Sequence, residues 1–181
     1  MNSKELIEKC SKGNQKAQKA FYYSYVDILY ATISRYIKEP SVIDDILFQG
    51  MMKIFNELEN FNYINESALV GWLKRIMINE ALMFLRADFR TLYKVEEISE
   101  INTDKLTAES QLDEKEITEV INQLPDGYRT VFLLYVVEGY SHKEIADKLD
   151  IAEGTSRSQY FKARNLLQEL LKHDYGKEFG T

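Results

Sequence analysis

The sequence predicts an all-helical protein with two small domains joined by a flexible acidic linker. Only two prolines and eight glycines interrupt the 181 residues, and apolar side chains recur at spacings of three and four, the period of a helix with one buried face. Acidic residues gather between residues 95 and 119, where nine carboxylates against two lysines give a net charge of −7. The whole chain carries −6, so the remainder is +1 and holds the basic surfaces.

Composition excludes several classes of function. Hydrophobic residues make up 45% of the chain and aromatic residues 12%, which is enough to build buried cores. No apolar run reaches the roughly 18 residues of a membrane span, and the first residues lack the order of a signal peptide. Cys10 is the only cysteine and there are two histidines, so neither a disulfide nor a metal cluster is expected. We expect a cytoplasmic protein with no cofactor, metal or catalytic chemistry.

The first domain, residues 1–94, begins with two predicted helices. Residues 17–37 have one apolar side and are followed by Pro40, a residue that ends helices. Ser41 suits the N-cap of the next helix, residues 42–58, because its hydroxyl can accept a hydrogen bond from a free amide of the first turn.

A third helix of this domain is predicted to be basic. It follows the polar and aromatic loop 60–66, Ser67 is expected to cap it, and it runs to about residue 86. Five basic and two acidic residues between 72 and 94 give a net charge of +3. Trp72 is most simply a core anchor. Three arginines are expected to lie along a phosphate backbone, although a solvated basic face would have the same sequence: Arg75, Arg86 and Arg90.

The acidic linker, residues 95–112, has no sustained apolar stripe and suits a loose connector. The second domain, residues 113–181, is expected to be helical again. Its first apolar stripe should stop at Gly139, because glycine tolerates the left-handed end of a helix.

A helix-turn-helix is predicted in the second domain. Ser141 and Glu144 fit a capping box at the start of a short helix, residues 142–149. After a tight turn, a further helix begins near Glu153. Two helices joined in this way are the parts of a DNA-reading motif.

The last predicted helix has two different sides. At 100° per residue, one sector is mostly apolar and should face the core. The opposite side, with Arg157 on its flank, has the hydrogen-bonding and basic composition of a surface that faces a DNA groove: Thr155, Arg157, Ser158, Phe161, Lys162 and Asn165. An ordinary three-helix bundle with a solvated polar side explains the pattern alone equally well.

The motifs of the second domain resemble the fourth conserved region of bacterial sigma factors, and in particular the extracytoplasmic-function group. The matching residues are Leu124-Pro125, Tyr128-Arg129, Val131 to Leu134, Glu138 to Ser141, Glu144 to Ala146, Glu153 to Thr155, Ser158 and Ala163-Arg164. The resemblance implies that this domain reads the upstream promoter element in duplex DNA. Ala152 stands where the family often has serine, and Gln159 where it often has a basic residue.

Residues 17–92 resemble the second conserved region of the same family. The match includes Asp44 to Leu47, Lys53 to Phe55 and the pattern Trp72-Leu73-x-x-Ile76-x-x-Asn79. The resemblance implies that helix 42–58 grips the clamp of core RNA polymerase through four residues: Asp44, Asp45, Gln49 and Lys53. Phe48 and Gln49 stand where a Gln-Glu pair is usual, so one acidic contact is missing.

The resemblance also implies a downstream promoter site that holds a base out of the stack. Its loop residues would be Phe61, Asn62, Tyr63 and Asn65. The basic helix would add Arg75, Asn79, Arg86 and Arg90. A loop packed by its own aromatic side chains is an equally open interpretation.

We therefore expect a sigma factor that binds core RNA polymerase and promoter DNA and promotes transcription initiation. The first alternative is a stand-alone helix-turn-helix regulator that does not depend on core polymerase, and the second is a helical adaptor that binds only proteins. An anti-sigma factor is a further partner that the resemblance allows. The promoter sequence, the inducing signal and the oligomeric state do not follow from the sequence.

Overall fold

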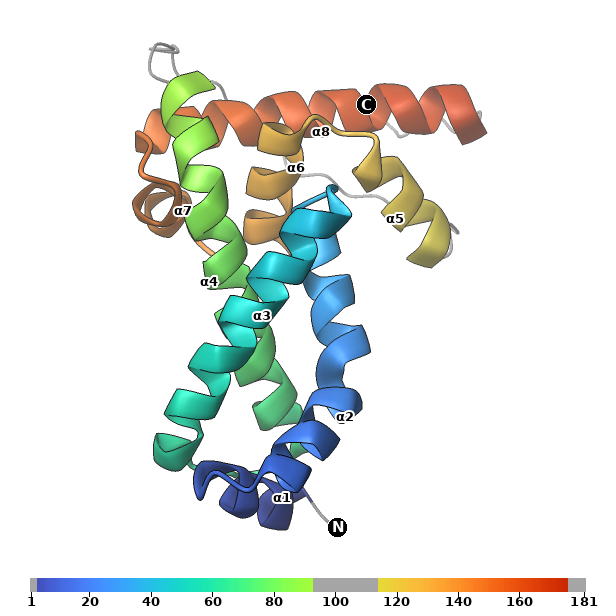
Figure 1. Cartoon of the computed structure of the whole chain (residues 1–181). Helices are drawn as coiled ribbons and strands as arrows, with labels where there is room; N and C mark the ends of the chain where they lie inside the picture. The colour runs from blue at the N-terminus through green and yellow to red at the C-terminus, as the bar shows by residue number, and fades with distance from the viewer. Residues whose placement is uncertain (1–2, 93–113, 176–181) are drawn as a thin grey trace. The chain divides into compact units, whose positions relative to one another are not determined.

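The chain is described by a computed structural model, which covers residues 3–92 and 114–175 (Figure 1). Every regular element within these ranges is helical, as predicted. The chain divides into two compact units, Met1–Phe84 and Leu85–Thr181. The predicted linker, residues 95–112, lies outside the described residues, and the domain bounds 1–94 and 113–181 stay predictions.

The first unit is built on four helices. These are α1 (Ser3–Ser11), α2 (Gln15–Ser34), α3 (Pro40–Glu57) and α4 (Glu66–Leu92), with a 3-10 turn at Leu58–Asn60 after α3. The last of them, α4, continues past Phe84 into the second unit. Helices α2 and α3 lie side by side, and α1 packs against both (Figure 1). Apolar side chains from all four helices form the core, among them Phe21, Leu29, Ile54 and Leu73.

Three of these helices were predicted, with different ends, and α1 was not. Helix α2 corresponds to the predicted helix 17–37, and α3 corresponds to the predicted helix 42–58. Helix α4 extends six residues beyond the predicted end at residue 86. The short α1 buries Leu6, Ile7 and Cys10, but nine residues give too few helical turns for a convincing period.

Both N-caps predicted for this unit are wrong. Proline occupies the first position of α3, where a missing N–H costs nothing, and the hydroxyl of Ser41 donates to Glu39 Oε1 at 3.1 Å instead of capping. At α4 the capping atom is Oδ1 of Asn65, which accepts from the amide of Ala68 at 2.8 Å. Ser67 therefore lies inside the first turn, because Asn65 is an equally good cap and comes first.

Helices α3 and α4 approach each other closely at Gly50. A Cβ atom at this position would lie 2.4 Å from Sδ and 2.8 Å from Cε of Met77, which is fully buried. The absence of a side chain at residue 50 therefore sets how near α4 can come to α3.

The second unit contains the predicted helix-turn-helix. Its helices are α5 (Glu114–Asn122), α6 (Asp126–Phe132), α7 (His142–Leu149) and α8 (Glu153–Tyr175), with a π-helical segment at Leu133–Val137 after α6. Helix α8 packs against α5, α6 and α7. Val120, Leu124, Phe132, Ala163 and Leu167 form a core cluster.

The signals that start and stop these helices are those the sequence predicts. Ser141 Oγ accepts from the amide of Glu144 at 3.3 Å, and Glu144 Oε2 accepts from the amide of Ser141 at 2.8 Å, which completes the capping box. Gly139 has φ +75°. The tight turn that follows α7 uses Asp150 with φ 57° and ψ 50°, a left-handed conformation that is uncommon outside glycine.

Candidate nucleic-acid and protein interfaces

One exposed polar stripe runs along α3. Asp45, Gln49 and Lys53 are spaced by four residues, so they follow one side of the helix, and all three are exposed. The ammonium of Lys53 lies 3.1 Å from Oε1 of Glu80 on α4. Asp44 is also exposed, next to this stripe. The structure therefore brings all four predicted polymerase-binding residues onto the accessible surface of one helix.

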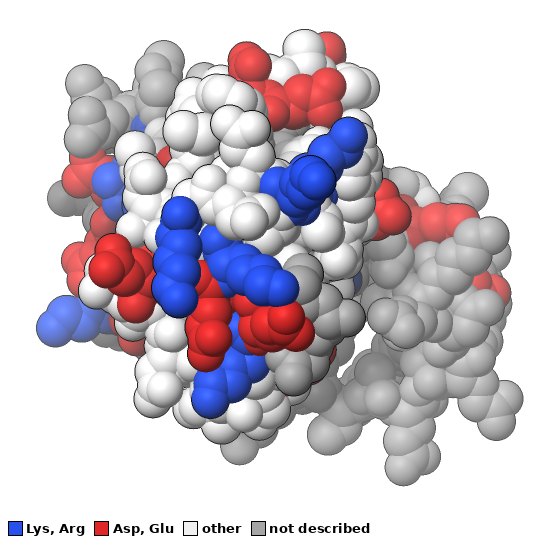
Figure 2. Space-filling view, turned by 60° about the horizontal axis from the view of Figure 1, so that its bottom comes forward, with Lys and Arg blue, Asp and Glu red and all other residues white. Residues whose placement is uncertain are grey.

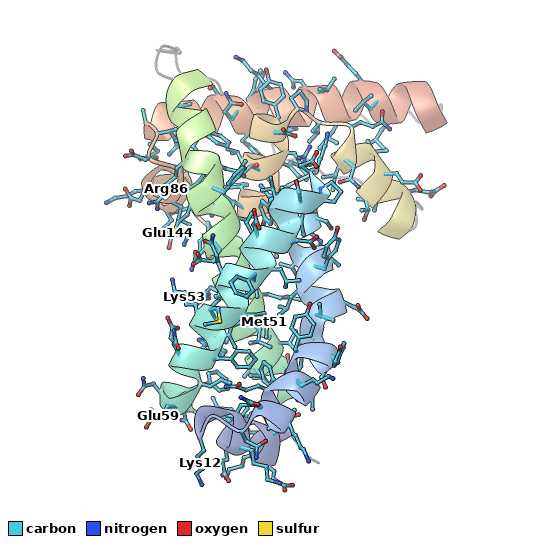
Figure 3. All side chains as sticks on the ribbon, in the orientation of Figure 1. Lys12, Met51, Lys53, Glu59, Arg86 and Glu144 are labelled. Carbon is cyan, nitrogen blue, oxygen red and sulfur yellow. The ribbon has the colours of Figure 1, made fainter. Side chains whose placement is uncertain are left out.

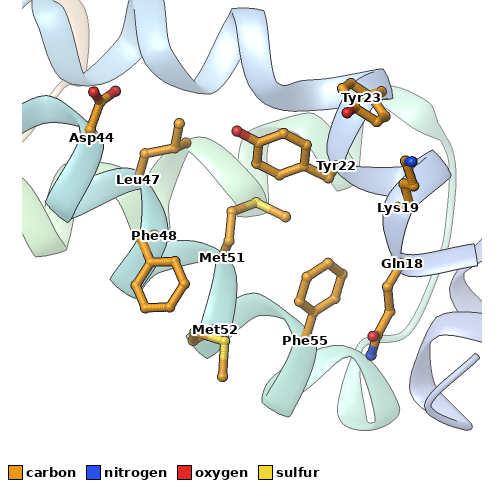
Figure 4. A pocket seen from close by; sticks show the side chains of 10 residues that line it. All are labelled: Gln18, Lys19, Tyr22, Tyr23, Asp44, Leu47, Phe48, Met51, Met52 and Phe55. Atoms are coloured by element: carbon orange, nitrogen blue, oxygen red, sulfur yellow. The ribbon is translucent and has the colours of Figure 1, made fainter. Parts of the chain in front are cut away.

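A groove of about 550 Å³ lies beside this stripe, between α2 and α3 (Figure 4). Most of its lining is apolar or aromatic, and Asp44 stands at its edge. The lining includes Tyr22, Tyr23, Leu47, Phe48, Met51, Met52 and Phe55. Lys53 and Met51 leave α3 in different directions (Figure 3), which separates the polar stripe from the groove.

Two groove residues are unusually accessible for their type, since Phe48 is 69% and Met52 50% exposed. In the sequence, Phe48 stands out only as a departure from a family pattern. Its spacing of four from Met52, outside the buried stripe of α3, is the signal that would have found the groove.

Aromatic stacking shapes the loop before α4. The ring of Phe61 stacks on Trp72, with centroids 4.5 Å apart and planes 29° apart. Asn62 is exposed and Tyr63 is half-buried. Trp72 is itself half-buried. Part of its indole therefore packs in the unit, and Phe61 of the loop stacks on it.

The end of this loop is tied to the first two helices through Glu66. Its Oε1 accepts from the hydroxyl of Tyr25 at 2.7 Å, and its Oε2 accepts from the hydroxyl of Ser3. Burial, followed by the hydrogen bond with Glu66, raises the pKa of Tyr25 to about 12. Tyr25 therefore stays a neutral donor, and the position of the loop's end is fixed.

The predicted basic surface follows one side of α4. At 100° per residue, Arg75, Asn79, Arg86 and Arg90 fall within about 60° of one another. Arg75 is exposed, and Asn79 and Arg86 are half-buried. Within the second unit, Nε of Arg86 donates to the carbonyl oxygen of Lys148 at 2.6 Å. The side chain of Arg90 lies outside the described part of the chain.

The end of the first unit that carries α1 has mixed charge. Figure 2 shows basic and acidic side chains side by side on this face. Lys9 Nζ lies 2.7 Å from Glu5 Oε1 within α1. Because the two signs alternate there, this face lacks the single-sign field that attracts a phosphate backbone.

The predicted DNA-facing residues of α8 differ in accessibility. Arg157 and Asn165 are exposed, and Phe161 and Lys162 are half-buried. Arg157 Nη2 lies 2.5 Å from Oε1 of Glu153 on the same helix.

Thr155 and Ser158 were expected on the accessible side of α8, and that expectation is wrong. They are 4% and 2% exposed, and the hydroxyl of Ser158 donates to the carbonyl oxygen of Thr155 at 3.0 Å. Helix α8 packs against both α6 and α7, so a wider sector of its first turns is covered than a single apolar stripe predicts. The buried Gln159 belongs to this sector.

Comparisons with known proteins identify both units. The family model described as Sigma-70 region 2 matches residues 21–91, and the model described as Sigma-70, region 4 matches residues 114–167. Two regions of this kind in this order define the class of RNA polymerase sigma factors. The match over residues 21–91 argues against a stand-alone helix-turn-helix regulator, and the match over residues 114–167 argues against a purely protein-binding adaptor.

Curated relatives narrow the class. The ECF RNA polymerase sigma-E factor of Haemophilus influenzae is 27% identical to the chain and is aligned over 95% of this chain and 96% of that protein. Its counterpart in Escherichia coli K12 is 29% identical, over 92% and 95%. The chain belongs to the ECF RNA polymerase sigma factors, which contain sigma-70 regions 2 and 4. It directs RNA polymerase to promoters and is itself a non-catalytic initiation factor.

Two solved structures that are similar to the chain were determined as complexes. The sigma factor RpoE of Bartonella quintana, bound to the anti-sigma factor NepR, has a TM-score of 0.47 and 24% identity over 86% of this chain and 97% of that one. CnrH, bound to the cytosolic domain of CnrY, has a TM-score of 0.44 and 23% identity over 93% and 96%.

Across residues 3–92 and 114–175, no helix is both long and apolar enough to cross a membrane.

Proposed function

We propose that the chain uses three surfaces, one that binds core polymerase and two that recognise promoter DNA. The polar stripe and groove of α3 bind core polymerase, the loop before α4 with the exposed side of that helix holds the opened downstream element, and α8 reads the upstream element. This division corresponds to domains at 1–94 and 113–181 with a linker at 95–112. We also propose that the protein acts in the cytoplasm, where polymerase and promoter meet.

The polymerase-binding proposal is supported by the combination of a polar stripe and an apolar groove on one helix. Protein interfaces place apolar and aromatic groups at their centre and polar groups at their rim. Phe48 and Met52 supply the first kind of group, and Asp45, Gln49 and Lys53 supply the second. Phe48 therefore offers an apolar contact where the family pattern has a polar one.

The observation that carries the downstream proposal is the stack of Phe61 on Trp72. Proteins hold single strands with aromatic faces, hydrogen-bonding groups and nearby positive charge. The stack presents an aromatic platform, Asn62 is an exposed amide in the same loop, and Arg75 is exposed one helical turn after Trp72. These are the groups that an unstacked base and its phosphate need.

The upstream proposal rests on the accessible residues of α8. Arg157, Lys162 and Asn165 combine charge and hydrogen bonding on the second helix of a helix-turn-helix, the element that enters the major groove in proteins of this kind. Thr155 and Ser158 are not part of this surface, because their side chains are buried.

Separating polymerase binding from DNA binding tests the proposal. Asp45→Lys should abolish co-purification with core polymerase at moderate salt, because it reverses a charge on the proposed interface. Asp27→Lys, the same charge reversal at another exposed aspartate, on α2, is the matched control. Arg157→Ala should leave co-purification intact while the holoenzyme binds its promoter about 5- to 100-fold more weakly.

The promoter for this test is first selected by the wild-type holoenzyme from a library. Co-purification of Asp45→Lys at the wild-type level would show that the polymerase surface lies elsewhere. Wild-type promoter affinity of the Arg157→Ala holoenzyme would likewise remove α8 as the reading helix.

A further inference from the structure

The two helices of the helix-turn-helix are joined by a buried hydrogen bond. His142, the first residue of α7, is 7% exposed, and its Nδ1 lies 3.0 Å from Oγ of Ser156, which is fully buried in the first turn of α8. Net hydrogen-bond energies in proteins are modest, but a buried bond between two helices constrains their relative geometry. The residue that follows Ser156 is Arg157, a proposed DNA contact.

Aromatic rings hold the imidazole in place from two other elements. The ring of Tyr135 stacks on it, with centroids 4.5 Å apart and planes 10° apart. The ring centroid of Tyr160, on α8, lies 5.7 Å from that of the imidazole and 4.6 Å from that of Tyr135. Tyr135 belongs to the π-helical segment, and such segments are rare and frequently occur at functional sites.

The surroundings of His142 favour a neutral ring. Burial lowers its pKa most, the charge of Arg157 lowers it further, and Glu153 opposes both. The free amides at the start of α7 also disfavour a positive charge there. Tyr135 and Tyr160 are further titratable groups whose rings contact the imidazole, and burial raises the pKa of Tyr160.

We propose that His142, through its hydrogen bond to Ser156, is a positioning residue that fixes the rotation of the DNA-reading helix α8. This inference rests on the proposed function of α8. A rotation of about 10° displaces a group about 6 Å from the helix axis by about 1 Å. Hydrogen bonds tolerate a range of about half an ångström in length, so such a rotation removes a base or phosphate contact.

The experiment uses the holoenzyme with core polymerase and a duplex promoter selected from a library. His142→Leu keeps the ring's bulk and removes the bond, Ser156→Ala removes the partner, and His142→Asn keeps a polar group near the position of Nδ1. We expect His142→Leu and Ser156→Ala each to weaken duplex binding about fivefold, the double variant to be no weaker than either, and His142→Asn to restore most of the affinity.

Two further readouts separate positioning from simple stability. Thermal unfolding of the full chain shows whether each variant is folded at the assay temperature. Burial and the charge of Arg157 disfavour a charged imidazole in this site, so lowering the pH below 6.5 should favour withdrawal of a protonated His142 and weaken wild-type binding. His142→Asn should lose that part of the pH profile.

Several outcomes overturn the inference. Wild-type affinity of folded His142→Leu or Ser156→Ala holoenzyme would do so, as would losses that add in the double variant. If Arg157→Ala weakens binding and the His142 and Ser156 variants do not, positioning fails while the reading helix stands. If none of these variants weakens binding, the proposed function of α8 fails as well.

Discussion

The ring of Phe61 and the indole of Trp72 are stacked 4.5 Å apart across the loop that precedes α4. The two residues are eleven positions apart, and both are half-buried. The stack gives Phe61 a fixed orientation within this polar and aromatic loop, which prepares it to receive a base at little cost in side-chain freedom.

Replacing Phe61 by alanine should impair promoter opening more than promoter binding. Stacking of one base on an aromatic side chain contributes about 1–3 kcal/mol, so the population of open complex should fall about 5- to 140-fold. Permanganate reactivity of the downstream element in holoenzyme complexes measures this population. Ile64→Ala, a change at a 72% exposed residue of the same loop, is the control. Equal reactivity of Phe61→Ala and wild type would contradict the prediction.

Phe48→Ala should weaken the association with core polymerase and leave the stability of the chain nearly unchanged. The side chain is 69% exposed in the free protein, so its removal opens no cavity. Apolar anchors at interfaces typically contribute more than about 1 kcal/mol, which corresponds to at least fivefold in the dissociation constant. Titration of labelled protein with core polymerase measures the effect. Ile28→Ala, on the outer side of α2, should bind as wild type does; an equal effect of both changes would exclude the groove.

Lys162→Ala should weaken holoenzyme binding to different promoters by a similar factor. The slope of log affinity against log salt concentration should also fall in magnitude by about one, because a phosphate contact releases a counterion whatever the base sequence. Binding titrations at several salt concentrations give the slope. Lys143→Ala, an exposed lysine on α7, is the comparison. An unchanged slope with unchanged affinity would remove Lys162 from the interface.

Lowering the pH from 7.5 to 5.5 should destabilise the second unit. The pKa of His142 is below its ordinary value of 6.5 in the folded chain, so the unfolded chain binds more protons in this range. Its contribution to stability is complete above the unfolded pKa and is lost as the pH falls through 6.5 toward the folded value. Urea midpoints at the two pH values measure the loss. His142→Asn should reduce it, His173→Asn should not, and equal losses in both variants would contradict the assignment to His142.

Arg129→Met should destabilise the second unit by about 1.5–3 kcal/mol, the range for hydrogen bonds to charged groups. The guanidinium is 1% exposed, and it donates to the carbonyl oxygen of Leu124 at 3.0 Å and to Asp126 Oδ1 at 2.7 Å. Loss of the arginine leaves the carbonyl oxygen without this donor, whereas Asp126 is 63% exposed and regains water. Asp126→Asn should therefore cost much less, as measured by urea unfolding; equal losses would show that the exposed ion pair dominates.

Local signals in the sequence predicted much of the fold, because their partners are close in the chain. The Ser141–Glu144 capping box and the stop at Gly139 need only three or four neighbouring residues. The cap of α4 was misassigned because Asn65 and Ser67 are competing caps two residues apart, and the earlier of the two is the one used.

The candidate sites were less predictable, because many of their contacts join residues of separate helices. The residue types on α3 and α8 indicated which helices carry function. The stack of Phe61 on Trp72, the bond from Tyr25 to Glu66 and the burial of Ser158 depend on how separate helices pack. Helical periodicity places a residue on its own helix and contains no information about the neighbouring one.

The contact at Gly50 has a consequence for how this protein changes during evolution. A side chain at residue 50 would occupy the space of the Met77 thioether, so the two positions share one volume. A larger residue at 50 then becomes acceptable only with a shorter one at 77, and the order of the two substitutions matters, because shortening first leaves a cavity and enlarging first creates a clash. Relatives with alanine or threonine at the position of Gly50 should therefore differ at the position of Met77 as well, and the two sites should vary together.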